Sequence, residues 1–295
     1  MRRLLLSLAC VALPLAACAT VMNALEDATD PNTAEGKLVR GANRIRKSAQ
    51  DLDPSEEHFI GRSVAAQILA MPQYALAEEP ALLTYVERIG HGLVATNDGV
   101  RRPFLDYRFG VLATDEVNAF ACPGGLILVT KGLLANTKTE DEVAAVLAHE
   151  IAHVTLRHGV AAIRQANLTS AFQYLGAGAL QATLSSEDLT KLTDVFGDSI
   201  GDVVGTLVTS GYSRDAEVAA DQLGREFLAN AGYDPQALSR VLTCMDGHAG
   251  GDGGMFATHP APQDRLAALG APLAVAPAAR GADARQQRFT AAFGR

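Results

Sequence analysis

The sequence predicts a mainly helical α+β domain in which a small β-sheet lies beside one central helix. Two observations predict this fold class. Apolar residues recur with the helical period around residues 139–155, and helix-start signals stand at Pro54, Pro80 and Ser213. Between the second and third helical stretches, short runs rich in Val, Leu, Ile and Phe are separated by turn residues, as in short strands.

The elements before the central helix follow in a clear order. Pro54-Ser55-Glu56-Glu57 opens a first helix, which stops near Pro72, and a second helix covers Pro80 to about Ala95. Three strands are then predicted, over 105–112, 117–121 and 126–130. The turn Pro123-Gly124-Gly125 joins the last two strands, and helices resume at Lys131.

The central helix has its own start signal and apolar stripe. Thr139 followed by Glu142 predicts a capping box. The stripe consists of Val143, Leu147, Ile151 and Val154, and the other face carries Val146, His149, Glu150, His153 and Arg157.

His149 and His153 stand four residues apart on this helix, with Glu150 between them. Positions i and i+4 of a helix lie about 40° apart around the axis and about 6 Å apart along it, so both rings can reach one ion. Glu150 is then placed beside the attacking water. The pattern predicts a hydrolytic zinc site. The alternative is a surface helix with two solvated histidines, although with 7 His in 295 residues the pattern is rare by chance.

A catalytic zinc site needs a third protein ligand, and Glu217 is the candidate. It lies on a predicted helix with Ser213 as N-cap. One face of that helix combines two acids with small residues that permit close approach of another helix: Glu217, Ala220, Asp221, Gly224 and Leu228. Asp221, one turn after Glu217, suits an outer acceptor for the free ring N–H of a ligand histidine.

Four separated blocks resemble the zinc metallopeptidase family of HtpX, the CAAX prenyl endopeptidase and BepA-like periplasmic lipoprotein proteases. The blocks are Asn118-Ala119-Phe120-Ala121 with Pro123-Gly124-Gly125, the His149–His153 motif, Ser213–Asp221, and Thr258-His259-Pro260 with Arg265. Together they cover roughly residues 56–268. The resemblance implies a zincin-like metallopeptidase domain that holds one Zn²⁺ per chain through His149, His153 and Glu217, with Glu150 as the general base. The chain lacks the apolar helices of membrane-spanning members after its first 18 residues, so it resembles the soluble envelope branch.

The N-terminus has the regions of a bacterial signal peptide. Arg2 and Arg3 precede an apolar run, and Leu15-Ala16-Ala17-Cys18 resembles a lipobox. We therefore expect removal of residues 1–17 and acylation of Cys18. The alternative, a transmembrane anchor, is disfavoured because the run is too short to span ~30 Å of hydrocarbon. No Asp follows Cys18, which favours the outer membrane facing the periplasm.

The remaining organisation is a linker over residues 18–55, a zinc metallopeptidase domain over 56–270, and a poorly ordered tail over 271–295 that is rich in Ala, Pro and Arg. Residues 165–186 carry no charge. This connector is expected to be a mobile cover or an amphipathic surface over the cleft; the alternative is a buried packing segment.

Composition narrows the class of protein. With 48% hydrophobic and 20% charged residues, the chain is globular rather than wholly disordered. A net charge of -8 argues against nucleic acid as a partner. Cys122 and Cys244 form either one disulfide or two separate thiols. Cys122 is a poor nucleophile candidate because it precedes a Pro-Gly-Gly turn rather than a helix start.

The predicted function is cleavage of unfolded or misassembled envelope proteins, with outer-membrane assembly machinery as a further candidate partner. Glu150 takes the proton of the attacking water and returns it to the leaving amine. His259 is the candidate donor to the oxyanion, and it could also occupy the open metal position and switch the enzyme off. The alternative for His259 is simple packing before Pro260.

Asn118 is the candidate substrate-binding residue. If residues 117–121 form the edge of the sheet, an extended substrate can pair with that strand, and the Asn118 amide can hold its backbone. Alternatively, Asn118 only shapes a turn. The other histidines, His58, His91 and His248, lie outside the motifs, and helical geometry predicts that His158 points away from the metal.

Two other functional classes fit the sequence less well. A chaperone or assembly factor that uses zinc for structure would not need Glu150 beside the site. A hydrolase of cell-wall peptides would need stacking surfaces for glycans, yet the chain has 5% aromatic residues and no Trp.

Overall fold

The computed structural model describes residues 52–162, 200–201, 203–246, 258–259, 262–270 and 281–294. The predicted signal peptide, Cys18, most of the linker, the uncharged connector and the glycine-rich segment that holds His248 lie outside these residues. Within the described ranges, every helix is too short or too polar to cross a membrane.

The sheet has three strands in the order β1-β3-β2. Strand β1 (Arg108–Leu112) runs parallel to β3 (Leu126–Thr130), and β2 (Ala119–Cys122) runs antiparallel to β3. The first two strands begin two to three residues later than predicted, and β2 extends through Cys122. The predicted edge position of β2 is confirmed for the sheet of the described residues.

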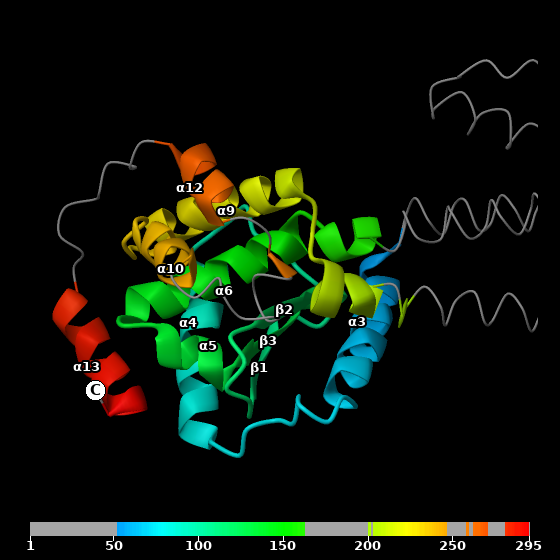
Figure 1. The fold of residues 1–295 in the computed structure, drawn as a ribbon, viewed down its shortest axis with the longest axis horizontal. Helices are drawn as coiled ribbons and strands as arrows, with labels where there is room; N and C mark the ends of the chain where they lie inside the picture. The colour runs from blue at the N-terminus through cyan, green and yellow to red at the C-terminus, as the bar shows by residue number, and fades with distance from the viewer. Residues whose placement is uncertain are drawn as a thin grey trace, which may run out of the picture.

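Side-chain alternation along β3 divides the interior into two hydrophobic cores. Ile127 and Val129 face a core shared with α4 (Pro80–Ala95) and α6 (Glu140–Thr155). Leu128 faces a second core shared with α3 (Pro54–Leu69). Because successive residues of a strand point to opposite faces, both faces of this short sheet are covered. Figure 1 shows α3 on one side of the strands and α4 and α6 on the other.

Both early helices match their predicted ranges. Helix α3 starts with a capping box, in which Asp53 accepts from the Glu56 amide and Glu56 accepts from the Asp53 amide. The turn Pro123–Gly125 packs closely against this helix: a Cβ on Gly61 would lie 1.7 Å from the Pro123 carbonyl oxygen. Glycine at this position is what lets the turn and the helix touch.

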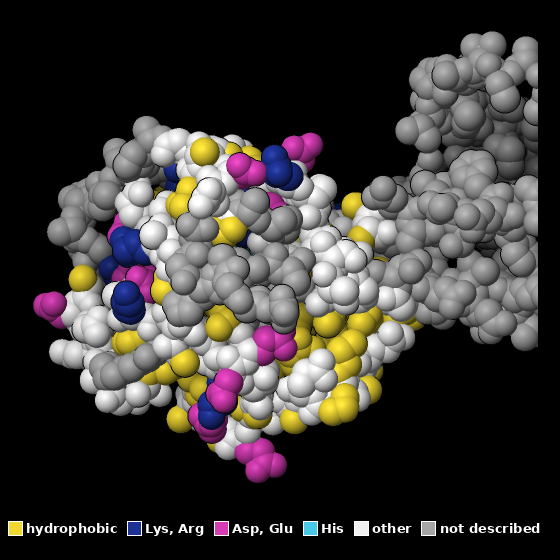
Figure 2. Space-filling model, in the orientation of Figure 1, with side chains coloured by type: hydrophobic (Ala, Val, Ile, Leu, Met, Phe, Trp, Pro, Cys, Tyr) yellow, Lys and Arg dark blue, Asp and Glu magenta, His cyan; other side chains and the backbone are white. Residues whose placement is uncertain are grey.

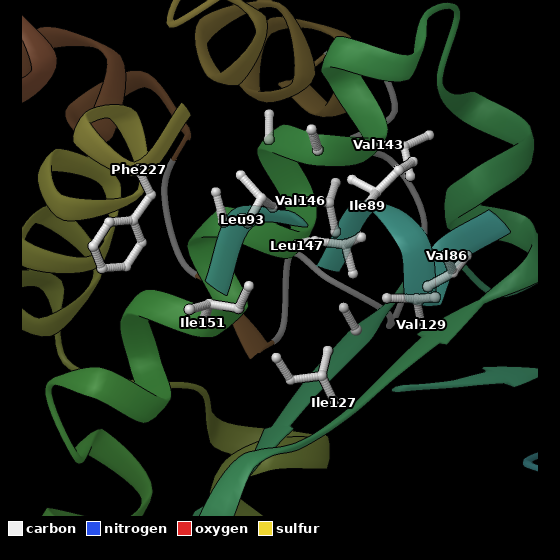
Figure 3. Close-up of a cluster of buried hydrophobic side chains, with 14 of the residues drawn as sticks. Val86, Ile89, Leu93, Ile127, Val129, Val143, Val146, Leu147, Ile151 and Phe227 are labelled. Atoms are coloured by element: carbon white, nitrogen blue, oxygen red, sulfur yellow. The ribbon is translucent and has the colours of Figure 1, made fainter. Parts of the chain in front are cut away.

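Helix α6 lies in the middle of the molecule. Thr139 caps it, but Glu142 accepts from the Lys138 amide rather than from Thr139, so only half of the predicted capping box forms. Figure 3 shows its apolar side chains amid those of α4 and β3: Val143, Val146, Leu147 and Ile151 against Val86, Ile89, Leu93, Ile127 and Val129. The predicted stripe, including Val154, is confirmed, but Val146, predicted on the other face, belongs to the same core.

The opposite face of α6 is buried as well, because α9 (Arg214–Asn230) and α10 (Ala237–Asp246) cover it. Helix α9 begins at the predicted N-cap Ser213, and its predicted face of acids and small residues is fully buried. A Cβ on Gly224 would lie 3.2 Å from the backbone of His149. Gly224 therefore allows α9 to approach α6 closely, as predicted.

The helix α5 (Lys131–Asn136), the π-helical segment η2 (Thr206–Ser210) and α12 (Pro262–Leu269) complete the domain before the tail.

The prediction of a poorly ordered tail is wrong for residues 282–293, which form helix α13 (Ala282–Phe293). Phe289 is buried in the core, and Arg285 and Arg288 pair with Asp141 and Glu140 at the start of α6. The composition rich in Ala and Arg suggested disorder, but the apolar residues of α13 pack on the domain. Its arginines pair with the acidic residues at the N-terminus of α6. Residues 271–280 lie outside the described ranges.

Cys122 and Cys244 are not joined to each other, so the disulfide alternative is wrong. Burial raises the pKa of the Cys122 thiol to about 12, with a further contribution from Glu150. This thiol is therefore protonated at neutral pH and is no nucleophile.

Candidate metal centre

Four side chains from three segments converge on one point. His149 and His153 come from α6, Glu217 from α9, and His259 from the segment that precedes α12. Their ligand atoms all lie within 4.8 Å of one another. The structure thus brings together the three predicted ligands and the predicted fourth group, His259.

The distances between neighbouring ligand atoms are close to those in a tetrahedral zinc site. Metal–nitrogen distances of about 2.0–2.1 Å imply ligand–ligand distances of ~3.3 Å. His149 Nε2 lies 3.0 Å from His153 Nε2 and 3.4 Å from His259 Nδ1. Glu217 Oε2 lies 3.5 Å from His149 Nε2, and Glu217 Oε1 lies 3.5 Å from His153 Nε2. Both carboxylate oxygens lie 3.0 Å from His259 Nδ1. The donor set and its geometry therefore fit zinc.

All four ligand side chains are buried, each with at most 3% of its surface exposed. On the face drawn in Figure 2, no histidine side chain is visible among the described residues. The alternative of a surface helix with solvated histidines is therefore wrong. Burial excludes competing water and strengthens the electrostatic interactions inside the site.

The outer nitrogen of His149 has the partner that the sequence predicted. His149 Nδ1 lies 2.9 Å from Asp221 Oδ1. Arg265, from α12, pairs with the same carboxylate through Nε at 2.7 Å and Nη2 at 2.6 Å, and its Nη1 lies 3.1 Å from Glu217. The resemblance had included Arg265 without assigning it a role. In the structure it is a buried cation that neutralises the two buried acids of α9.

These contacts shift the pKa values of the groups involved. Burial and Arg265 lower the pKa of His149, but hydrogen bonds with Asp221 and Glu217 outweigh them and raise it to about 9. Burial alone would raise the pKa of Glu217, yet the charge of His259 and hydrogen bonds with His149 and His259 hold it well below its usual range. Glu217 is therefore ionised, as a metal ligand must be.

The prediction for His158 is wrong, because its ring does not point away from the site. His158 Nδ1 lies 2.8 Å from His153 Nδ1. Helix α6 ends at Thr155, and Arg157 takes a left-handed conformation with φ 59°. The chain is helical again from His158, so the regular spacing assumed in the prediction is broken between the two histidines.

Tyr212 packs on the same histidine. Its ring stacks on His153 with a centroid distance of 4.3 Å and an interplanar angle of 20°. Its hydroxyl is buried and makes no hydrogen bond among the described residues. Sequence reasoning missed Tyr212. The available signal was its position directly before Ser213, the N-cap of the helix that carries Glu217.

Glu150 is buried, and neither carboxylate oxygen has a hydrogen-bond partner among the described residues. His259 Nε2 lies 3.8 Å from Glu150 Oε1. Burial raises the pKa of this carboxyl, while the charges of His259 and His149 lower it. A buried carboxylate without a partner needs a ligand or water, which agrees with its position beside the metal ligands.

Two hydrogen bonds hold the segment that carries His259. The Thr258 hydroxyl lies 3.2 Å from the side-chain oxygen of Asn118, and the Tyr212 amide donates to the Thr258 carbonyl at 3.3 Å. Asn118 is fully buried, and its amide nitrogen donates to Glu116 at 3.1 Å. In this structure the Asn118 side chain thus holds protein groups, and its role towards substrate stays a prediction.

A HExxH helix, a glutamate ligand on a second helix and a small sheet beside them define a metallopeptidase domain. Residues 80–273 match the model of peptidase family M48, so the chain belongs to this family.

Several relatives share this region. The chain is 31% identical to the beta-barrel assembly-enhancing protease of Yersinia pestis over 232 residues, which are 74% of this chain and 46% of the relative. The beta-barrel assembly-enhancing protease of Escherichia coli is 30% identical over 196 residues, 65% of this chain and 39% of the relative. Metalloprotease LoiP of Escherichia coli is 29% identical over 189 residues, 63% of this chain and 69% of the relative. The chain thus spans less than half the length of the two beta-barrel assembly-enhancing proteases.

Proposed function

We propose that this chain is a zinc-dependent endopeptidase in which His149, His153 and Glu217 hold one zinc ion and Glu150 is the general base. The observation that carries the proposal is Glu150, whose two buried oxygens have no hydrogen-bond partner in the described part of the chain although they lie beside a set of metal-ligand side chains. A structural zinc site has no use for such a group. Membership of family M48 supports the same activity.

The residues of the chain supply the proton transfers. When bound, zinc polarises the peptide carbonyl and acidifies the attacking water. Glu150 accepts a proton from that water and delivers it to the leaving amine. Burial raises the pKa of Glu150, which favours the protonated form that donates to the leaving amine.

His259 determines whether the site is open. Its Nδ1 lies among the side-chain atoms that would hold zinc, so in this conformation His259 would take the place that the attacking water needs and inhibit the enzyme. For catalysis the ring must leave this position. Its Nε2 lies 3.8 Å from Glu150 Oε1, on the side of the site where the general base acts. From there the displaced ring can donate a hydrogen bond to the oxyanion.

Substrate binding and release of His259 are linked through Asn118. A substrate strand that pairs with the edge of β2 would need the Asn118 side chain that now meets Thr258. Substrate and the His259 segment therefore compete for one side chain. Extended backbone is the feature read at such an edge, which favours unfolded or loop regions of proteins as substrates.

For location and substrates we propose the bacterial cell envelope. Cys18 would carry a lipid anchor, with residues 1–17 removed and the enzyme facing the periplasm from the outer membrane. Two relatives are named for enhancing beta-barrel assembly, which favours unfolded or misassembled envelope proteins as substrates and the assembly machinery as a partner.

The second candidate is a chaperone-like assembly factor with latent peptidase activity. The specific observation in its favour is the fourth ligand, His259, which closes the metal site. The two candidates differ in one result: a zinc-loaded endopeptidase cleaves an unfolded protein, whereas a zinc-loaded assembly factor does not.

The test is cleavage of unfolded casein by the full chain in detergent, compared with Glu150→Gln. We expect the variant to retain zinc and lose at least about 10²-fold in activity, since the general base is absent. Equal activity of the two proteins would contradict the role of Glu150. If both are inactive with zinc bound, the assembly factor is favoured.

Self-inhibition is tested in the same assay with Thr258→Val, which removes the hydroxyl that meets Asn118 but leaves His259 in place. Loss of a hydrogen bond worth about 1 kcal/mol should open the site about fivefold more often and raise kcat/KM by that factor. An unchanged or lower kcat/KM would contradict the seating role of Thr258.

A further inference from the structure

The two histidines of the HExxH motif need the same outer support. Each places Nε2 among the metal ligands, so its Nδ1 carries the proton and must donate it to an acceptor. His149 Nδ1 donates to Asp221. For His153, the only group within hydrogen-bond distance of Nδ1 among the described residues is His158 Nδ1, at 2.8 Å.

We propose that His158 is a positioning residue for the metal centre. Its neutral imidazole accepts the Nδ1–H of His153 through its own Nδ1, which fixes the tautomer of His153 that presents a lone pair on Nε2 to the metal. The proposal rests on the zinc site proposed above and extends it to a residue that the HExxH-plus-Glu pattern does not contain.

The fold builds this contact. On a continuous helix, residues five apart point about 140° away from each other. Here the left-handed Arg157 reverses that direction and brings the two rings to a centroid distance of 4.9 Å. Arg157 is itself fixed, because its guanidinium donates to the Leu52 carbonyl at 2.9 Å and lies 3.3 Å from Glu57. A non-glycine residue is strained in this conformation, so the surroundings must maintain it.

Tyr212 completes the support of His153 from a second direction. Its ring covers the face of His153, whereas His158 meets the edge of that ring. The two contacts together leave the imidazole no freedom to rotate away from the metal. His158 is not itself a ligand, since it faces Nδ1 and not the Nε2 that joins the cluster.

The experiment compares zinc affinity of the full chain in detergent, by competition with a chromophoric chelator, for wild type, His158→Phe and His158→Asn. Phenylalanine keeps a ring but offers no acceptor, and the side-chain oxygen of asparagine can stand near the position of Nδ1. We expect zinc affinity to fall about 10- to 100-fold in His158→Phe and to recover to within about threefold of wild type in His158→Asn. His91→Phe, on α4, serves as the control and should leave zinc affinity unchanged.

The same variants are assayed on casein, where kcat should follow zinc occupancy while KM stays constant, because His158 does not touch the substrate. Equal zinc affinity in wild type and His158→Phe would overturn the proposal, and so would an asparagine variant as weak as the phenylalanine variant. If His158→Phe does not fold, His158→Leu takes its place under the same criteria. Failure of the zinc site itself would show separately, as a wild-type protein that binds no zinc.

Discussion

The two histidines of α6 that we propose as zinc ligands are held in opposite ways. His149 is supported by charge from distant segments: Asp221 of α9 and Arg265 of α12. His153 is supported by uncharged groups, His158 just beyond the same helix and the ring of Tyr212. Both rings are buried to the same degree. The comparison therefore isolates the effect of the partner from the effect of burial.

The difference is visible in the proton affinity of the two rings. The pKa of His149 rises to about 9, because hydrogen bonds to Asp221 and Glu217 outweigh burial and the charge of Arg265. The pKa of His153 falls well below its usual range, because burial and the charge of His149 act without a compensating carboxylate on its outer side. A charged partner ties the histidine to the stability of the whole fold, whereas a neutral local partner orients it without adding a buried ion.

The largest effect is expected from Asp221→Ala, which removes the acceptor of His149 and leaves much of the Arg265 charge uncompensated. Arg265 is 2% exposed, so the free energy of unfolding should fall by about 3–5 kcal/mol. Urea unfolding in the presence of a chelator measures this loss without any contribution from zinc.

The matched variant on the His153 side is His158→Phe. In the same measurement its free energy of unfolding should fall by about 1 kcal/mol, the value of one neutral hydrogen bond. Equal losses in the two variants would remove the distinction between the charged and the neutral side. The double variant Asp221→Ala with Arg265→Met should recover part of the stability, because the unpaired cation is then absent.

Sequence reasoning found the parts of the site that regular helices determine. The spacing of His149 and His153, the N-caps Thr139 and Ser213, and Asp221 one turn after Glu217 all follow from helical geometry. Each of these predictions needed only the period of one helix and its start signal.

The parts that it missed depend on a break or on a long-range contact. The position of His158 depends on the left-handed conformation of Arg157, which no local signal announces in a residue other than glycine. The role of Arg265 depends on the packing of α12 against α9. Helix α13 is folded because Phe289 packs into a core that other segments of the chain form. Such contacts exist only after the chain has folded.

A smaller effect is expected from Gly224→Ala, which tests the close approach on the His149 side. The added Cβ would lie 3.2 Å from the Cα and the amide nitrogen of His149, so α9 must move away from α6 by a few tenths of an ångström. We expect a loss of about 1–3 kcal/mol in the free energy of unfolding, together with weaker zinc binding.

The control is Gly92→Ala on α4, where a Cβ would meet nothing within 4 Å. There the higher helix propensity of alanine should stabilise the protein by up to about 1 kcal/mol. Opposite signs at the two glycines would show that crowding at His149, and not helix propensity, sets the result. A stabilised Gly224→Ala would mean that the two helices tolerate separation at the metal site.

The smallest effect is expected from Tyr212→Phe on the His153 side. The Tyr212 hydroxyl is buried and has no hydrogen-bond partner among the described residues, so its removal leaves no group unpaired and costs at most about 1 kcal/mol. The ring stays in place, and zinc affinity should remain within about twofold of wild type. Tyr212→Leu, which removes the ring that stacks on His153, should weaken zinc binding more than Tyr212→Phe does. If Tyr212→Phe instead lowers kcat about 10²-fold while zinc stays bound, the hydroxyl reaches the reacting peptide. Tyr212 would then take part in the reaction, and the uncharged groups around His153 would contribute to substrate binding rather than to metal binding.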